Sequence, residues 1–114
     1  MERDCIFCRI VGGEVPADIV ERSDDAIVLR DLKPQAPTHV LVIPTAHYAN
    51  LGEFVGQAKP DAVGRLFATA SRLGRDAGTG GYRVVVNEGR NGGQTVDHLH
   101  LHVFAGRPMH WPPG

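Results

Sequence analysis

Histidine occupies every second position at the start of the segment 98–104, which reads HLHLHVF. Side chains of an extended strand alternate between its two faces, so His98, His100 and His102 would point to one side, about 7 Å apart. The leucines and the valine between and after them would point to the other side. The pattern predicts a strand with one apolar face and one imidazole face.

The imidazole row is a poor way to build a core and is suited to holding a phosphate or a metal. A neutral imidazole is a nucleophile near pH 7 and also transfers protons, and its neighbours in the row could bind charge and orient it. Two other interpretations stay open: metal ligation by the row, or a surface strand with chance histidines. Because metal sites usually gather ligands from different elements, a purely metal role for all three is disfavoured.

The rest of the chain predicts four further strands and one long helix. The expected strands cover residues 19–20, 26–29, 39–43 and 82–86. The helix runs from Asp61 to Asp76, with an apolar stripe at Val63, Leu66, Phe67, Ala70 and Leu73. A short helical turn over residues 5–11 closes at a glycine pair. This order predicts an α+β fold with an antiparallel sheet, in which the last two strands pair.

Length and charge narrow the class of protein. The chain has 114 residues, enough for one domain, and its net charge of −1 without a basic block argues against nucleic acid as a partner. No apolar run approaches membrane-spanning length, and no signal-peptide core follows the charged first residues. We therefore expect a cytoplasmic protein with no membrane partner. Residues 108–114 form a proline-rich tail that must dock on something to be ordered.

A glycine-rich loop, Gly89 to Thr95, leads directly into the histidine strand. Glycine lets main-chain N–H groups approach an anion closely, so the loop could face the same phosphate as the imidazoles. An ordinary hairpin loop is the alternative. Beside the histidine row, we favour a phosphate cradle.

Cys5 and Cys8 are separated by two residues, a spacing that lets both thiolates bind one metal ion. His47, just beyond a predicted strand, and His98 are the candidate third and fourth ligands. The resulting Cys2His2 zinc site would tie the N-terminus to the sheet. A redox pair and two inert buried thiols are the alternatives, although a redox motif of the thioredoxin type needs a βαβ context that is missing here.

Four further residues stay open on the sequence alone. His39 opens a predicted strand and Asp31 follows another. Each is either part of the functional site or an ordinary surface residue, in a capped turn or as a solvated carboxylate. His110 and Trp111, in the tail, could equally be packing anchors.

Together these residues make the chain resemble the histidine triad (HIT) family, in its nucleotide-binding branch. The family pattern is His-φ-His-φ-His-φ-φ, with φ apolar, and residues 98–104 fit it throughout. The resemblance also covers residues 5–8 (CIFC), 31–44 (DLKPQAPTHVLVIP), 82–89 (YRVVVNEG) and 92–114. It is weakest over residues 48–80, and the ending MHWPPG is especially like that branch.

The resemblance implies a HIT-like fold, with a five-stranded antiparallel sheet, one long helix and a short N-terminal helix. Residues 1–114 would form a single HIT domain, in which residues 106–114 are a tail that docks near the active site. The resemblance also implies a homodimer whose two sheets join into one continuous ten-stranded sheet, with the long helix at the interface.

The implied activity is hydrolysis of the P–N bond of purine nucleoside 5′-phosphoramidates of the AMP-amine type. His100 would attack the α-phosphorus and form a nucleotidyl-histidine intermediate, while His102 and His39 bind or polarise the phosphate. Thr95, which matches a serine of the family, would hydrogen-bond the leaving group. Among the implied nucleotide-binding residues, Asp31 would bind the ribose, and Leu29 and Leu32 would enclose the base. The phosphate would be bound by Asn87, Gly93, Thr95, Val96, His100 and His102. Trp111 would reach the partner subunit's site and touch the leaving group. No divalent metal is needed at the phosphate in this scheme.

The sequence departs from the family pattern at a few positions. The cysteine pair resembles zinc-containing bacterial members, in which the first histidine of the triad, here His98, binds the metal, whereas the tail resembles animal-type members. Thr45 stands where a lysine is usual. Asp97 stands where many members have an apolar or aromatic residue, and strand alternation points it away from His98.

Two other functions stay open. A sister branch would make the chain a dinucleoside polyphosphate hydrolase or nucleotidyl transferase, although the tail differs from that branch. A dimeric nucleotide-binding sensor with incidental catalysis is the third interpretation. The base preference also stays open, because an apolar slot made by Leu29 and Leu32 discriminates little between adenine and guanine.

Overall fold

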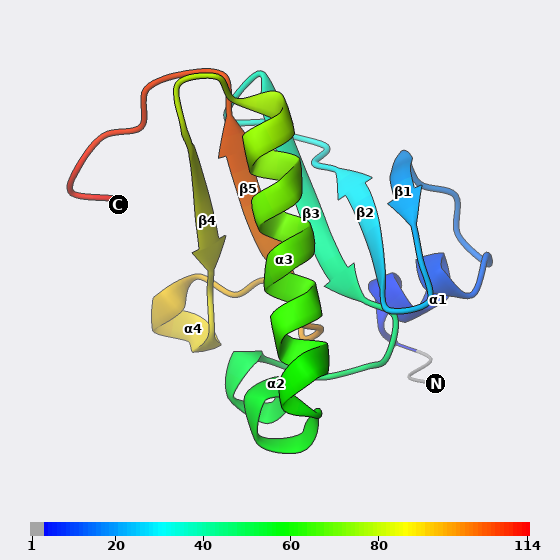
Figure 1. Cartoon of the computed structure of the whole chain (residues 1–114). Helices are drawn as coiled ribbons and strands as arrows, with labels where there is room; N and C mark the ends of the chain where they lie inside the picture. The colour runs from blue at the N-terminus through cyan, green and yellow to red at the C-terminus, as the bar shows by residue number, and fades with distance from the viewer. Residues whose placement is uncertain (1–3) are drawn as a thin grey trace.

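The computed structural model describes residues 4–114, which form a five-stranded sheet and four helices (Figure 1). The strands are β1 (Ile19–Arg22), β2 (Ala26–Arg30), β3 (Thr38–Pro44), β4 (Tyr82–Val86) and β5 (Leu101–Ala105). The helices are α1 (Ile6–Val11), α2 (Leu51–Gln57), α3 (Pro60–Ala77) and α4 (Gly89–Gly92). The strand order is β1-β2-β3-β5-β4, with every neighbouring pair antiparallel. The predicted α+β fold with a five-stranded antiparallel sheet is confirmed.

The histidine segment enters the sheet later than the sequence predicts. β5 begins at Leu101, so the prediction of a strand across all three histidines is wrong for His98 and His100. The main-chain N–H of Leu99 donates to the carbonyl of Tyr48, 2.7 Å away, instead of joining a strand ladder. The alternation of faces still holds, because Leu99 and Leu101 are buried on the α3 side while the rings of His98 and His100 contact α1 on the other.

Apolar side chains cover both faces of the sheet. α3 crosses one face (Figure 1), and α1 packs on the opposite face. β2 and β3 contribute side chains to two apolar cores, one on each face of the sheet. Ala26, Val28, Val40 and Val42 face α3, whereas Ile27, Leu29, Leu41 and Ile43 face α1. A strand buried on both faces reads as a continuous apolar run, which is the pattern of both segments.

The apolar stripe predicted for α3 packs against the sheet except at Phe67, whose side chain is 37% exposed. Gly74 is buried at the next turn of the same helix because the ring of Tyr82, in β4, lies directly against it. None of the helices within residues 4–114 is long and apolar enough to cross a membrane.

Two short helices lie outside the predicted elements. The side chain of Asn50 caps α2 by accepting from the N–H of Glu53, and the Glu53 carboxylate accepts from the N–H of Ala49. An Asn followed three residues later by a Glu is a helix-start signal that the sequence carries. The glycine-rich stretch contains the four-residue α4, which ends at Gly93 in the left-handed conformation (φ 90°).

The C-terminal tail leaves the sheet beside β4. The Arg83 guanidinium donates to the carbonyl oxygen of His110, 2.9 Å away. In Figure 1 the tail runs outward past β4, on the side of the sheet away from β1. Trp111 is 83% exposed in the single chain.

Candidate functional site

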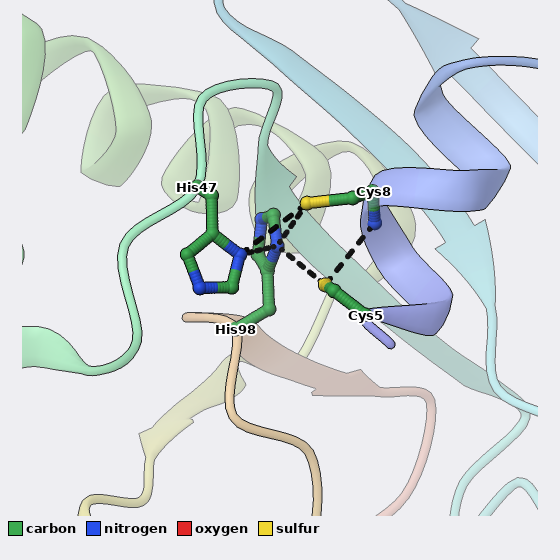
Figure 2. A group of neighbouring side chains, drawn as sticks. All are labelled: Cys5, Cys8, His47 and His98. Carbon is green, nitrogen blue, oxygen red and sulfur yellow. Dashed lines mark hydrogen bonds between the residues drawn. The ribbon is translucent and has the colours of Figure 1, made fainter. Parts of the chain in front are cut away.

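Four side chains from three separate segments converge on one point (Figure 2). Cys5, the N-cap of α1, and Cys8, in its first turn, present their sulfurs to the sheet. His47 comes from the loop after β3, and His98 from the segment before β5. The His98 Nδ1 atom lies 3.1 Å from Cys5 Sγ, 3.5 Å from Cys8 Sγ and 3.1 Å from His47 Nδ1. Cys8 Sγ lies 3.3 Å from His47 Nδ1.

This group has the chemistry of a zinc site. Tetrahedral zinc, with bonds of about 2.0–2.1 Å to nitrogen and about 2.3 Å to sulfur, places neighbouring donor atoms roughly 3.3–3.8 Å apart. The group's four donor atoms all lie within 4.8 Å of one another, close to that spacing. His98 Nε2 donates to the carbonyl oxygen of Pro44, 2.9 Å away, so its Nδ1 lone pair faces the sulfurs. Burial lowers the pKa of His98, which keeps the imidazole neutral and able to bind a metal.

A cleft of about 500 Å³ lies next to the metal-binding group, between α1 and the sheet. It brings together seven of the predicted nucleotide-binding and catalytic residues: Leu29, Asp31, Leu32, Thr95, Val96, His100 and His102. Its apolar wall is made by Ile6, Phe7 and Ile10 of α1, which were not among the predicted site residues. Leu32, at the mouth, is 94% exposed. The other four, His39, Asn87, Gly93 and Trp111, do not line this cleft within the single chain as described.

The position of the His100 ring is fixed from two sides. His100 Nδ1 donates to the carbonyl oxygen of His98, 2.8 Å away, and the Phe7 ring packs edge-on at 5.2 Å between centroids. A neutral imidazole that donates through Nδ1 carries its lone pair on Nε2. The side chain is buried, and it lines the cleft. His100 therefore offers an unprotonated nitrogen to a ligand in the cleft.

His39 and His102 are joined by a hydrogen bond whose direction is set by the main chain. The N–H of Gln35 donates to His39 Nδ1 at 3.1 Å, so the proton of neutral His39 is on Nε2. That Nε2 lies 3.0 Å from His102 Nδ1 and 3.5 Å from Asp31 Oδ2. His102 Nδ1 then accepts, and its own proton is on Nε2. Asp31, His39 and His102 are also close enough to hold a metal, but the proton on His39 Nε2 favours a chain of hydrogen bonds.

Both imidazoles of this pair are held neutral. The pKa of His102 is lowered to about 4, chiefly by burial and also by the neighbouring His100 and His39, against the opposing effect of Asp31. Burial also lowers the pKa of His39, again against the effect of Asp31. Near pH 7 the pair is uncharged, so His102 presents a neutral N–H donor beside the lone pair of His100.

The loop before the triad is fixed by side chains that the sequence analysis did not single out. Gln94 Oε1 accepts from the N–H of Gly89 at 3.0 Å, while its Nε2 donates to the carbonyls of Ala49 and Val96. The Glu88 carboxylate accepts from the N–H of Gly52 at 2.8 Å. No local sequence signal identifies these residues, because each of them also bonds to the distant segment 49–52.

Comparison with known proteins places the chain and its fold in one family. The HIT domain matches residues 12–109. The chain is 46% identical over 115 residues to an uncharacterised HIT-like protein of Synechococcus elongatus, covering 100% of each chain. It is 39% identical over 113 residues to a 14 kDa zinc-binding protein of Brassica juncea, covering 97% of this chain and 100% of the other. Among solved structures, a HIT family hydrolase from Legionella pneumophila has a TM-score of 0.91 and 41% identity, over 97% of this chain and 100% of that one.

Proposed function

This chain belongs to the HIT domain family, and we propose that it is a nucleotide-binding hydrolase that cleaves the P–N bond of purine nucleoside 5′-phosphoramidates. One observation carries the proposal: His100 presents its Nε2 lone pair in the cleft because its Nδ1 proton is held by the carbonyl of His98. An imidazole fixed in this tautomer is a nucleophile that needs no separate base.

The reaction proceeds in two displacements. His100 Nε2 attacks the α-phosphorus and the P–N bond breaks; the leaving nitrogen takes a proton from solvent and departs as the amine, hydrogen-bonded to the hydroxyl of Thr95. Water then attacks the phosphorus, loses a proton to solvent and breaks the bond to His100 Nε2, which releases the nucleoside monophosphate and restores the neutral imidazole. His102, with His39 behind it, donates to a phosphate oxygen through Nε2. Stabilisation of charge on these oxygens is the main contribution of a protein to this chemistry.

The nucleotide is proposed to lie along the cleft with its base against the apolar end. Leu29 and Leu32 enclose the base, together with the apolar wall of α1, and Asp31 binds the ribose hydroxyls. The phosphate is held by Asn87 and by the loop residues Gly93, Thr95 and Val96. This orientation is supported by the lining of the cleft, which is apolar beside α1 and polar near the histidines.

A structural zinc ion is proposed for Cys5, Cys8, His47 and His98. The donor set, the donor spacing and the similarity to a protein named as zinc-binding support it. When bound, the metal would tie α1 to the triad segment; the displacement at phosphorus uses the chain's own imidazoles and amides.

A homodimer completes the proposal, with the two sheets joined into ten strands and Trp111 reaching the partner's site. The exposure of Trp111 and of Phe67, and the outward course of the tail past β4, are consistent with such a contact. The cytoplasmic location expected from the sequence belongs to the same proposal.

The decisive experiment measures AMP release from adenosine 5′-phosphoramidate and from diadenosine polyphosphate, with the wild type and His100→Ala side by side. We expect fast cleavage of the phosphoramidate alone, no turnover by His100→Ala, and unchanged AMP binding by the variant. Preference for the dinucleotide would assign the chain to the sister branch. AMP binding without turnover of either substrate would favour a nucleotide sensor, and turnover by His100→Ala would refute the nucleophile assignment.

A further inference from the structure

The side chain of Gln94 joins three segments around the cleft. Its Nε2 donates to the carbonyl of Ala49 at 2.6 Å and to that of Val96 at 3.0 Å, and its Oε1 accepts from the N–H of Gly89 at 3.0 Å. Both protons and the oxygen of the amide are used. An amide side chain with this set of partners fixes the main chain around it, since each lost contact would leave a backbone group unpaired.

The two residues after Gln94 carry main-chain donors with no acceptor in the part of the chain that the structure describes. Thr95 and Val96 line the cleft, and their N–H groups have no hydrogen-bond acceptor within residues 4–114. Such N–H groups, side by side in a loop, are suited to binding an anion. Their direction depends on the loop, which lies between the left-handed Gly93 and the triad.

The other contacts of this loop are local or exposed: Gly93 and Gln94 donate main-chain hydrogen bonds to the carbonyls of Arg90 and Gly89, and the exposed Glu88 accepts from the N–H of Gly52. The helix before it, α4, has only four residues and no side-chain cap. The amide of Gln94 is the contact that ties both ends of the loop, Gly89 and Val96, to the fixed segment before α2.

We propose that Gln94 is a positioning residue for the reaction, whose side-chain amide aims the N–H groups of Thr95 and Val96 at the α-phosphate. The proposal rests on the proposed function, because it assumes that a nucleotide phosphate occupies the cleft. Gln94 itself touches no substrate. It acts by pre-organising donors, so its removal weakens binding of the phosphate and leaves binding of the nucleoside intact.

The test compares AMP with adenosine, which lacks the phosphate, by calorimetry on the zinc-loaded protein. Gln94→Met keeps the length of the side chain and removes all three hydrogen bonds. We expect it to weaken AMP binding by about tenfold or more, the loss equivalent to one or two hydrogen bonds, and to change adenosine binding by less than about twofold. Gln57→Met, at the exposed end of α2, is the matched control and should leave both affinities unchanged.

A second variant gives a pH signature. Gln94→Glu keeps the shape and the acceptor for Gly89, but its second oxygen faces the carbonyls of Ala49 and Val96. We expect a larger loss of AMP affinity than in Gln94→Met at pH 8. The ratio of its AMP affinity to that of the wild type should rise toward pH 5, because a protonated carboxyl again donates to a carbonyl. This variant also keeps the test open if the methionine variant fails to fold.

The outcomes separate the two proposals. If the wild type binds neither ligand, the proposed function fails, and this inference fails with it. If the wild type binds AMP and the Gln94 variants bind it equally well, the proposed function stands and the inference is refuted. Equal losses for AMP and adenosine would also refute it, because they would show a general structural role for Gln94.

Discussion

His100 donates its Nδ1 proton to the carbonyl oxygen of His98 across 2.8 Å, and His98 turns its own ring into the Cys2His2 group. The residue that fixes the proposed nucleophile is therefore one of the four candidate metal ligands. Phe7, on the helix held by the two cysteines, packs edge-on against both rings, at 5.8 Å from His98 and 5.2 Å from His100. A metal ion bound in the group would stabilise the cleft as well as the N-terminus.

Removal of the metal should lower stability and nucleotide affinity together. With the metal stripped by a chelator, or with Cys8→Ser, α1 loses its tie to the sheet and the apolar wall of the cleft loosens. We expect Tm to fall by about 10 °C or more, and AMP affinity to fall with it. Metal content by mass spectrometry, calorimetric melting and AMP titration check this.

Arg9→Ala is the matched control for that experiment, because Arg9 lies on the same helix and its side chain, among residues 4–114, makes an exposed ion pair with Glu14. It should keep full metal content and Tm. A chelated protein that melts at the temperature of the untreated one would contradict the structural role of the metal.

The histidine tautomers can be observed directly. The hydrogen bonds predict protons on Nε2 of His39, His98 and His102 and on Nδ1 of His100. Long-range ¹H–¹⁵N correlation spectra of the imidazoles distinguish the two tautomers at neutral pH. A proton on Nε2 of His100 would remove its lone pair from the cleft and contradict the nucleophile assignment.

The same chain of hydrogen bonds predicts unequal effects of two substitutions. His102→Ala removes the proposed phosphate donor and should lower kcat by about a hundredfold or more. His39→Leu removes the hydrogen bond that fixes the tautomer of His102, and should cost less. Steady-state kinetics on the phosphoramidate compare the two variants, and a larger loss for His39→Leu would show that His39 is the main phosphate donor.

Gly74 and Gly64 offer a paired test of packing in α3. A Cβ at Gly74 would overlap the ring of Tyr82, whose hydroxyl is hydrogen-bonded to the Ser71 hydroxyl at 2.8 Å. A Cβ at Gly64 would meet no atom within 4 Å. Gly74→Ala should therefore destabilise the protein by about 1–3 kcal/mol. Gly64→Ala should stabilise it by up to about 1 kcal/mol through helix propensity. Urea unfolding measures both, and equal effects would contradict the close packing of α3 on β4.

The sequence predicts the faces of the sheet better than the ends of its elements. The alternation of His98, His100 and His102 with leucines places every imidazole on the α1 side, as the structure has them. The start of β5 could not be predicted, because it depends on a hydrogen bond between Leu99 and the distant Tyr48. Phe67 fits the helical period of the buried stripe, but its exposure depends on where β4 lies.

The residues of the candidate site also differ in how far the sequence reveals them. Residues that carry chemistry, such as the cysteine pair and the triad, stand out by type and spacing in the sequence. Gln94 and Gln35 do not, because Gln94 bonds to main-chain groups, one of them in the distant Ala49, and Gln35 acts through its own main-chain N–H, which no side chain reveals. Asn50 and Glu53 are different: their capping pair was readable and would have located α2.

Stability should fall as the pH is lowered from neutral toward about 4. The pKa of His102 is about 4 in the folded chain and 6.5 in the unfolded chain, chiefly because burial disfavours the charged form. Between these values the unfolded chain binds more protons, so the free energy of unfolding decreases as the pH falls through this window; above pH 6.5 both states are neutral and the contribution is complete. The lowered pKa values of His39 and His98 act in the same direction.

His102→Gln isolates one part of this dependence, because glutamine does not titrate and the other histidines are retained. Urea unfolding of both proteins at pH 7.5, 6 and 5 should show a smaller loss of stability in the variant. The difference should be about 1 kcal/mol between pH 7.5 and 5, since the side chain is only partly buried and solvent screens its charge. Release of a bound metal at low pH affects both proteins and cancels in the comparison. Parallel curves would mean that His102 titrates normally in the folded chain, and its role as a neutral phosphate donor would then be confined to pH values above its ordinary pKa.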